Sequence, residues 1–281
     1  MGWEYLYLAA ALAFIFGIKR LGKVRTARGG NRLAALGMLG SIVAVCLLTP
    51  QLEWWVVIAG LVVGSAIGAI AAARVQFTEM PELVAAFNGT GGAASSFVAF
   101  AYLASNVLAV GSGTTFPEAN GVGLASAITV PITILIGTAT LTGSIAAYLK
   151  LGGKKLTHPV SGSARHYFNA LLGVILIASA VGMVTIADDV TLIALAAVVT
   201  VVSAVLGLSL VLPIGGADMP VVVALLNSYS GIAASASGFI LNNQMLVVCG
   251  ALVGASGLIL TQIMCKAMNR SLGNVLLGGI G

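Results

Sequence analysis

The chain has 281 residues, of which 59% are hydrophobic and only 7% are charged. An ordinary soluble domain carries about 25% charged residues, so a water-soluble fold could not bury this much apolar surface. The apolar runs are also far longer than the roughly ten-residue alternating strands of a membrane barrel. The composition therefore predicts an all-α integral membrane protein.

Apolar segments long enough to cross a hydrocarbon core of about 30 Å occur roughly nine times along the chain. In chain order we expect spans near residues 3–18, 33–49, 54–73, 81–104, 122–149, 167–187, 190–212, 219–240 and 244–265. The fourth, fifth and eighth spans contain many Gly, Ser and Thr residues and are the weakest insertion signals. The expected architecture is a bundle of about nine transmembrane helices.

The basic residues predict the orientation, because Lys and Arg in short loops are retained on the cytoplasmic side. All 13 of them follow spans one, three, five and nine: Lys19, Arg20, Lys23, Arg25, Arg28, Arg32, Arg74, Lys150, Lys154, Lys155, Arg165, Lys266 and Arg270. The charged residues of the opposite loops are all acidic, namely Glu53, Glu118, Asp188 and Asp189. We therefore expect the N-terminus outside and the C-terminus in the cytoplasm. The net charge of +5 reflects this topology and not a nucleic-acid partner, which would need basic and aromatic residues on one face.

Residues 79–100 and residues 218–239 repeat each other at a constant offset of 139 positions. Each copy opens with an acid, a Met and a Pro, and the two acids are Glu79 and Asp218. Both copies begin a span that leaves the cytoplasmic side, so they form parallel repeats, a symmetry found among transporters. An acid at this place can be a helix cap, since it accepts from unpaired N–H groups, or it can be a functional group.

Asn88 and Asn227 occupy equivalent places, nine positions beyond the two acids. A rise of 1.5 Å per residue puts each carboxamide about 13–14 Å up its helix, close to the middle of the hydrocarbon core. One interpretation is an interhelical hydrogen bond, worth about 0.6 and at most about 2 kcal/mol. The other is a polar step in a proton or ion path.

Glycines at a spacing of four residues predict close helix packing in two spans. Gly60, Gly64 and Gly68 form such a ridge in span three, and Gly250 and Gly254 form another in span nine.

Several stretches carry long and specific motifs: Thr78–Val84, Gly215–Val223, Leu226–Gly231, Gly250–Gly254 and Ile263–Ser271. They resemble the membrane domain of the beta subunit of proton-translocating NAD(P) transhydrogenase. The resemblance extends over essentially the whole chain, and the N-terminal third matches more loosely.

This resemblance implies a proton channel in a bacterial inner membrane that couples inward proton flow to hydride transfer from NADH to NADP⁺. In the family, the beta subunit carries an NADP(H)-binding domain after its last helix, NAD(H) binds on the alpha side, and the enzyme works as a dimer. We therefore expect residues 1–265 to be a transmembrane proton-channel domain and residues 266–281 a cytoplasmic linker toward that nucleotide domain. On this interpretation the chain alone is not catalytic and binds no cofactor or metal. Its partners are the alpha subunit, with its membrane helices, and the NADP(H) domain.

The resemblance also suggests roles for individual residues. The proton path would include Asn88, Asn227, Glu79, Glu82 and Ser256, and coupling to the nucleotide domain would involve Asp218 and Arg270. Asn88 stands where well-known members of the family carry a His thought to relay the proton, and Asn does not titrate near neutral pH. The proton then passes through water organised around Asn88 and Asn227, or an alpha-subunit helix supplies the titrating group, and we prefer the second interpretation. His158 and His166 fall in a basic loop, where we expect solvated side chains.

The alternative function is a secondary transporter of a small solute or ion, with a midplane site built from the two parallel repeat helices. A coding frame beyond Gly281 would separate the two functions, because the transhydrogenase interpretation requires a strand, a Gly-rich turn and a helix there.

Overall fold

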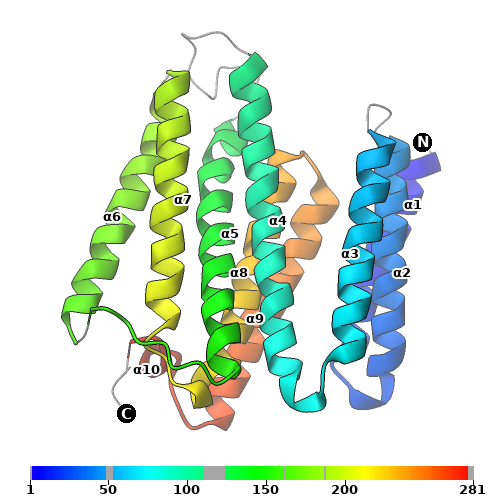
Figure 1. The fold of residues 1–281 in the computed structure, drawn as a ribbon. Helices are drawn as coiled ribbons and strands as arrows, with labels where there is room; N and C mark the ends of the chain where they lie inside the picture. Colours follow the sequence, from blue (N-terminus) through cyan, green and yellow to red (C-terminus); the bar gives the residue numbers. More distant parts are fainter. Residues whose placement is uncertain (1, 49–52, 110–123, 161, 187, 278–281) are drawn as a thin grey trace. The chain divides into compact units, whose positions relative to one another are not determined.

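A computed structural model of the chain describes residues 2–48, 53–109, 124–160, 162–186 and 188–277 (Figure 1). The described residues form helices and no strands. They divide into two compact units, residues 1–75 and residues 76–281, and each unit is described by itself. Glu118 and Gly278–Gly281, named in the sequence analysis, lie outside the described residues.

The first unit contains the helices α1 (Gly2–Leu21), α2 (Val24–Leu48) and α3 (Trp54–Arg74). The second span was expected to begin near residue 33, but α2 begins nine residues earlier, so only Gly22 and Lys23 connect the first two helices. Glycines allow α1 and α2 to touch along their backbones: a Cβ atom on Gly30 would lie 2.7 Å from the carbonyl oxygen of Gly17. The two helices therefore form a tight hairpin, whereas α3 has no buried residue.

The second unit holds the remaining helices, and α8 is the most deeply buried of the long ones. In chain order its elements are η1 (Phe77–Glu79), α4 (Met80–Ala109), α5 (Leu124–Leu151), α6 (Ala164–Thr185), α7 (Asp189–Val211), η3 (Gly216–Asp218), α8 (Met219–Ile240), α9 (Gln244–Ala267) and α10 (Leu272–Leu277). Helix α8 packs against α4, α5 and α9. The element that carries the second repeat copy is thus the centre of this unit.

The predicted spans coincide with the long helices that the structure describes. Eight of these helices are long and apolar enough to cross a membrane. The first helix, α1, is not among the eight, and it carries Lys19 and Arg20 in its last turn. The prediction of a helical, multi-pass membrane protein is confirmed, and the orientation of the termini stays a prediction.

The two repeat copies have the same local structure. The short helix η1 leads directly into α4, and η3 leads directly into α8, at the offset of 139 residues found in the sequence. Both long helices begin at the same end of the second unit, so the copies are parallel as predicted (Figure 1). The ends of α5, α7 and α9 lie at this end too, together with the loops that carry the basic residues of this unit.

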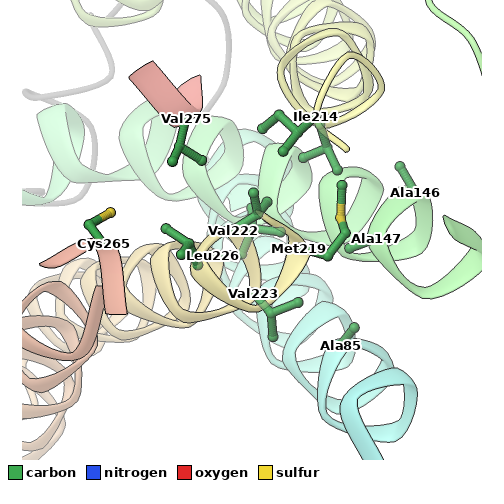
Figure 2. Packing of buried hydrophobic residues seen from close by; sticks show 12 residues of the cluster. Ala85, Ala146, Ala147, Ile214, Met219, Val222, Val223, Leu226, Cys265 and Val275 are labelled. Carbon is green, nitrogen blue, oxygen red and sulfur yellow. The ribbon is translucent and has the colours of Figure 1, made fainter. Parts of the chain in front are cut away.

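Apolar side chains from several helices meet where α8 begins (Figure 2). Met219 at the start of α8 is fully buried, and Val222 lies one turn further along. Cys265 from α9 and Val275 from α10 belong to the same cluster. This cluster holds the short helix α10 and the end of α9 against the beginning of the second repeat copy.

Direct backbone contact between α8 and α9 depends on glycine. A Cβ atom on Gly231 would lie 2.3 Å from the backbone nitrogen of Gly254, and one on Gly250 would lie 2.4 Å from that of Ser235. The packing predicted for Gly250 and Gly254 is therefore present. No atom lies within 4 Å of the corresponding positions on Gly60, Gly64 and Gly68, so the ridge of α3 has no such neighbour among the described residues.

We predict that Gly231→Ala lowers the free energy of unfolding of the second unit by about 1–3 kcal/mol, because the added methyl group forces α8 and α9 apart. The measurement is thermal unfolding of the detergent-solubilised chain. Gly173→Ala in α6 is the matched control: no atom lies within 4 Å of its Cβ position, so it should not lower the free energy of unfolding and should gain up to about 1 kcal/mol from the higher helix propensity of Ala. Equal unfolding temperatures for the two variants would contradict the α8–α9 contact.

Candidate functional site: a three-helix polar junction and an ion pair

The carboxamide of Asn88 joins three helices of the second unit. Its Nδ2 donates to the hydroxyl of Ser144 on α5 at 2.9 Å. The hydroxyl of Ser230 on α8 donates to its Oδ1 at 2.6 Å. Asn88 is only 7% exposed; its bond to Ser144 is buried and its bond to Ser230 is partly buried. We call Asn88, Ser144 and Ser230 the polar junction.

Small residues bring α4 and α5 close enough for this junction to form. A Cβ atom on Gly92 would lie 2.6 Å from the carbonyl oxygen of Gly137, and one on Gly89 would lie 3.1 Å from the Cβ atom of Ser144. With larger side chains at these positions the helix axes would separate, and Asn88 would no longer reach α5. Glycines next to Asn88 therefore serve helix packing, which is their common role in membrane bundles.

Polar side chains continue along the α4–α5 interface beyond the junction. Ser96, two helical turns after Asn88, lies 3.2 Å from the hydroxyl of Thr138. Between these pairs, the hydroxyl of Thr140 is buried and has no hydrogen-bond partner among the described residues. A buried hydroxyl without a partner is costly, so this position is suited to an ordered water molecule. The sequence analysis did not single out these hydroxyls, although Thr138, Thr140 and Ser144 are closely spaced on one span.

Asn227 does not join the polar junction, although the repeat pairs it with Asn88. Its side chain is half-buried and makes no hydrogen bond with the part of the chain that the structure describes. The neighbouring Ser228 instead donates to the carbonyl oxygen of Gly254 at 2.7 Å, and so contacts α9. The second repeat copy thus contributes Ser230, three residues after Asn227, to the bond with Asn88.

The remaining residues predicted for the proton path lie away from the junction. Ser256 is exposed on α9 and donates to the carbonyl oxygen of Val253 in its own helix. Glu79 is exposed and its Oε2 accepts from the backbone nitrogen of Gln76 at 3.1 Å, in a capping box. Glu82 is half-buried in the first turn of α4. The cap interpretation therefore fits Glu79, and no hydrogen bond links these three side chains to Asn88.

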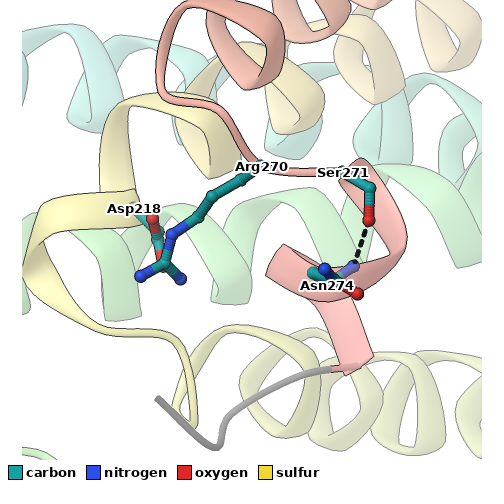
Figure 3. Close-up of polar contacts among 4 residues, drawn as sticks. All are labelled: Asp218, Arg270, Ser271 and Asn274. Carbon is teal, nitrogen blue, oxygen red and sulfur yellow. Dashed lines mark hydrogen bonds and ion pairs between the residues drawn. The ribbon is translucent and has the colours of Figure 1, made fainter.

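Asp218 and Arg270 form an ion pair of 2.8 Å where α8 begins and α9 ends (Figure 3). The carboxylate is 11% exposed and the guanidinium 46% exposed. Asp218 makes no side-chain cap bond to α8, so the two repeat acids have different partners. The second carboxylate oxygen, Oδ1, is buried without a hydrogen-bond partner among the described residues.

The end of α9 positions Arg270 for this contact. Asn269 adopts a left-handed backbone conformation with φ 53°, which Asn tolerates better than most residues. The backbone nitrogen of Arg270 then donates to the carbonyl oxygen of Cys265 at 2.9 Å, a bond typical of a helix that ends in a Schellman motif. The chain turns there into α10, where the hydroxyl of Ser271 accepts from the backbone nitrogen of Asn274 (Figure 3).

Two further polar contacts tie the loops at this end of the unit. Lys150 at the end of α5 donates to the carbonyl oxygens of Leu212 and Ile214, which follow α7. His158, expected to be solvated, is half-buried, and its Nε2 lies 2.7 Å from the hydroxyl of Ser209 on α7. The sequence could not show that this loop folds back onto α7.

Comparison with known proteins shows the family of this chain. The family described as NAD(P) transhydrogenase beta subunit matches residues 3–281. The chain belongs to this family. Two relatives named NAD(P) transhydrogenase subunit beta, both from Rhodospirillum rubrum, are 40% identical over 283 aligned positions. The alignment covers 98% of this chain and 57% of each relative, so the chain spans somewhat more than half the length of these beta subunits.

The described residues show no fold for a dinucleotide and no cluster for a metal ion. They contain no strand, and hence no strand-turn-helix cradle for a dinucleotide. They also contain no group of three His, Cys, Asp or Glu side chains that could hold a metal ion. The contacts that the described site does show are the hydrogen bonds of Asn88 and the ion pair of Asp218 with Arg270.

We predict that Asn88→Leu destabilises the chain by about 1–2 kcal/mol, because it leaves the hydroxyls of Ser144 and Ser230 without their partner. The equivalent repeat substitution, Asn227→Leu, removes no hydrogen bond seen among the described residues and should change stability by less than about 0.5 kcal/mol. Thermal unfolding of both variants in one detergent measures the difference. The polar junction would be refuted if Asn227→Leu proved the more damaging change.

Proposed function

We propose that the chain is the proton-conducting membrane part of a NAD(P) transhydrogenase, which couples inward proton flow to hydride transfer from NADH to NADP⁺. The observation that carries this proposal is the polar junction. A carboxamide deep in a membrane helix is uncommon and marks functional paths, and Asn88 connects helices of both repeat copies. Family membership favours this function over the alternative of a solute transporter.

The complete enzyme that we propose needs more than this chain. NADP(H) would bind a domain of the same subunit, and NAD(H) would bind on the alpha side. An alpha subunit would add membrane helices, and two copies of the whole would form a dimer in a bacterial inner membrane. The chain itself would bind neither nucleotide, since its described residues have no dinucleotide fold.

We further propose that the titrating group of the proton path comes from an alpha-subunit helix. Asn88 donates and accepts hydrogen bonds but does not ionise near neutral pH. It can still orient a water molecule or an imidazole from a neighbouring helix. Asn227, whose carboxamide has no hydrogen bond among the described residues, is available for the same task. Glu79, Glu82 and Ser256 would serve as more distant polar positions on this path.

Asn88→Leu should reduce proton-coupled turnover of the assembled enzyme at least tenfold, whereas Asn88→His should retain it, because an imidazole also donates and accepts. Asn227→Leu should also reduce it. The measurement is proton pumping together with hydride transfer in membrane vesicles that contain all subunits. Thr200→Ala on α7 is the control: its hydroxyl donates to the carbonyl oxygen of Ala196 in its own helix, so no contact between helices is removed. If Asn88→Leu and Asn227→Leu both pump protons at the wild-type rate, the two asparagines serve only helix packing.

We also propose that the ion pair of Asp218 and Arg270 transmits the nucleotide state to the proton path. Asp218 begins the helix that carries Ser230, and Arg270 follows the last long helix. Because the pair links the start of α8 to the end of α9, a pull on Arg270 would act directly on α8. The unpartnered Oδ1 of Asp218 leaves one carboxylate position for a further donor.

Asp218→Asn should cost less than about 1 kcal/mol of stability, since the amide still accepts from Arg270, and Arg270→Ala about 1–2 kcal/mol, since it leaves a buried carboxylate unpaired. Each should alter the dissociation constant for NADP(H) in the complete enzyme about tenfold. If the two residues act as a pair, the dissociation constant for NADP(H) in the double variant should change no more than it does in the more strongly affected single variant. If a variant instead unfolds the bundle while the enzyme that stays folded still couples hydride transfer to proton flow normally, the substituted residue has a structural role only.

A further inference from the structure

A cavity of about 540 Å³ lies between α1 and α2 at the end of their hairpin. Three basic side chains line one part of it, Lys19, Arg20 and Lys23. Ala13, Phe16 and Leu33 line another part. The cavity therefore combines positive charge with an apolar wall, and all of its lining comes from the first unit.

The two kinds of lining are ordered along α1. From Ala13 through Phe16 to Lys19 the lining residues recur every three positions, so they lie on one side of the helix. From Ala13 to Arg20, both within α1, the helix advances seven residues, or about 10 Å. One side of the cavity thus changes from apolar to basic within a length comparable to a lipid headgroup and the first part of its acyl chains.

The basic residues of this cavity have no acidic partner. Among the described residues, Lys19, Arg20 and Lys23 form no ion pair. The only acids in the first unit are Glu4 and Glu53, which belong to the start of α1 and the residue before α3, away from this connection. Within the first unit, no described acid offsets this positive charge.

The connection between the helices is held in a fixed shape. The hydroxyl of Thr26, another lining residue, donates to the carbonyl oxygen of Arg20 at 2.7 Å. The backbone contact of Gly17 with Gly30 fixes the spacing of the two helices just beside it. A preformed cavity loses less entropy when a ligand binds than a flexible loop would.

We propose that this cavity binds the headgroup of an anionic phospholipid, with the phosphate between Lys19, Arg20 and Lys23 and an acyl chain along Phe16 and Leu33. Basic pockets between membrane helices suit such headgroups, because the low dielectric strengthens charge pairing and the tails remain in the bilayer. The apolar wall distinguishes this site from one for free phosphate, which would leave Phe16 and Leu33 in contact with water. The site does not depend on the proposed function.

The test measures lipid binding to the complete, detergent-purified chain by native mass spectrometry. Dioleoylphosphatidylglycerol should bind saturably and dioleoylphosphatidylcholine at least tenfold more weakly. The triple variant Lys19→Gln, Arg20→Gln, Lys23→Gln should lower the affinity for phosphatidylglycerol at least tenfold. The matched control is Lys154→Gln, Lys155→Gln, Lys266→Gln, which removes the same charge from residues that do not line the cavity, and it should retain the affinity.

Three outcomes would overturn the proposal. The first is an equal loss in the control, which would mean unspecific attraction to basic residues. The second is displacement of the bound lipid by inorganic phosphate at matched ionic strength, which would mean a free-anion site. The third is unchanged binding in the triple variant. If the triple variant fails to fold, the single variant Arg20→Gln is measured in its place. We expect it to lower the affinity for phosphatidylglycerol about threefold, and unchanged affinity would contradict the proposed site.

Discussion

Lipid offers no hydrogen-bond partner, so a polar side chain inside this bundle is costly unless it finds one on its own helix or on a neighbouring one. Many of the Ser and Thr residues satisfy this requirement locally, as Thr133 does by donating to the carbonyl oxygen of Thr129. Asn88 cannot satisfy both ends of its carboxamide in that way, and it bonds instead to α5 and α8. The constraint that organises the site is thus the need to pair a carboxamide where water is scarce.

Close helix approach is what makes such pairing possible. Between α4 and α5 the contact is made by Gly92 and Gly137, and between α8 and α9 by Gly231 and Gly254. Each contact brings backbones within reach of short side chains, so that Ser144 can meet Asn88 and Ser228 can meet Gly254. Glycine therefore serves both the stability of the bundle and the placement of its polar groups.

The two repeat copies have the same secondary structure, but their equivalent side chains make different contacts. Both start with a short 3-10 turn followed by a long helix. In the first copy Glu79 caps the turn, and its equivalent Asp218 pairs with Arg270. Nine residues further along, Asn88 has hydrogen-bond partners on two helices, and its equivalent Asn227 has none among the described residues. The asparagine of the first copy therefore centres the polar junction, and the acid of the second copy forms the ion pair.

The sequence by itself determined the helical, membrane-spanning class, the approximate place of the long helices, the parallel repeat and the family. The physical reason is that a span must be apolar over the thickness of a bilayer, so run length alone reveals it. It did not show that α2 begins at Val24, because basic residues at a helix end look like a loop.

Only the tertiary structure decided which polar groups meet. The partners of Asn88 lie 56 and 142 residues away, and Arg270 lies 52 residues from Asp218. Such pairings depend on how each helix is rotated about its axis, which packing at glycines sets and which periodicity in an almost uniformly apolar sequence does not reveal. For the same reason the sequence could not tell the buried glycines of α9 from those of α3, which have the same spacing and no neighbour within 4 Å among the described residues of the first unit.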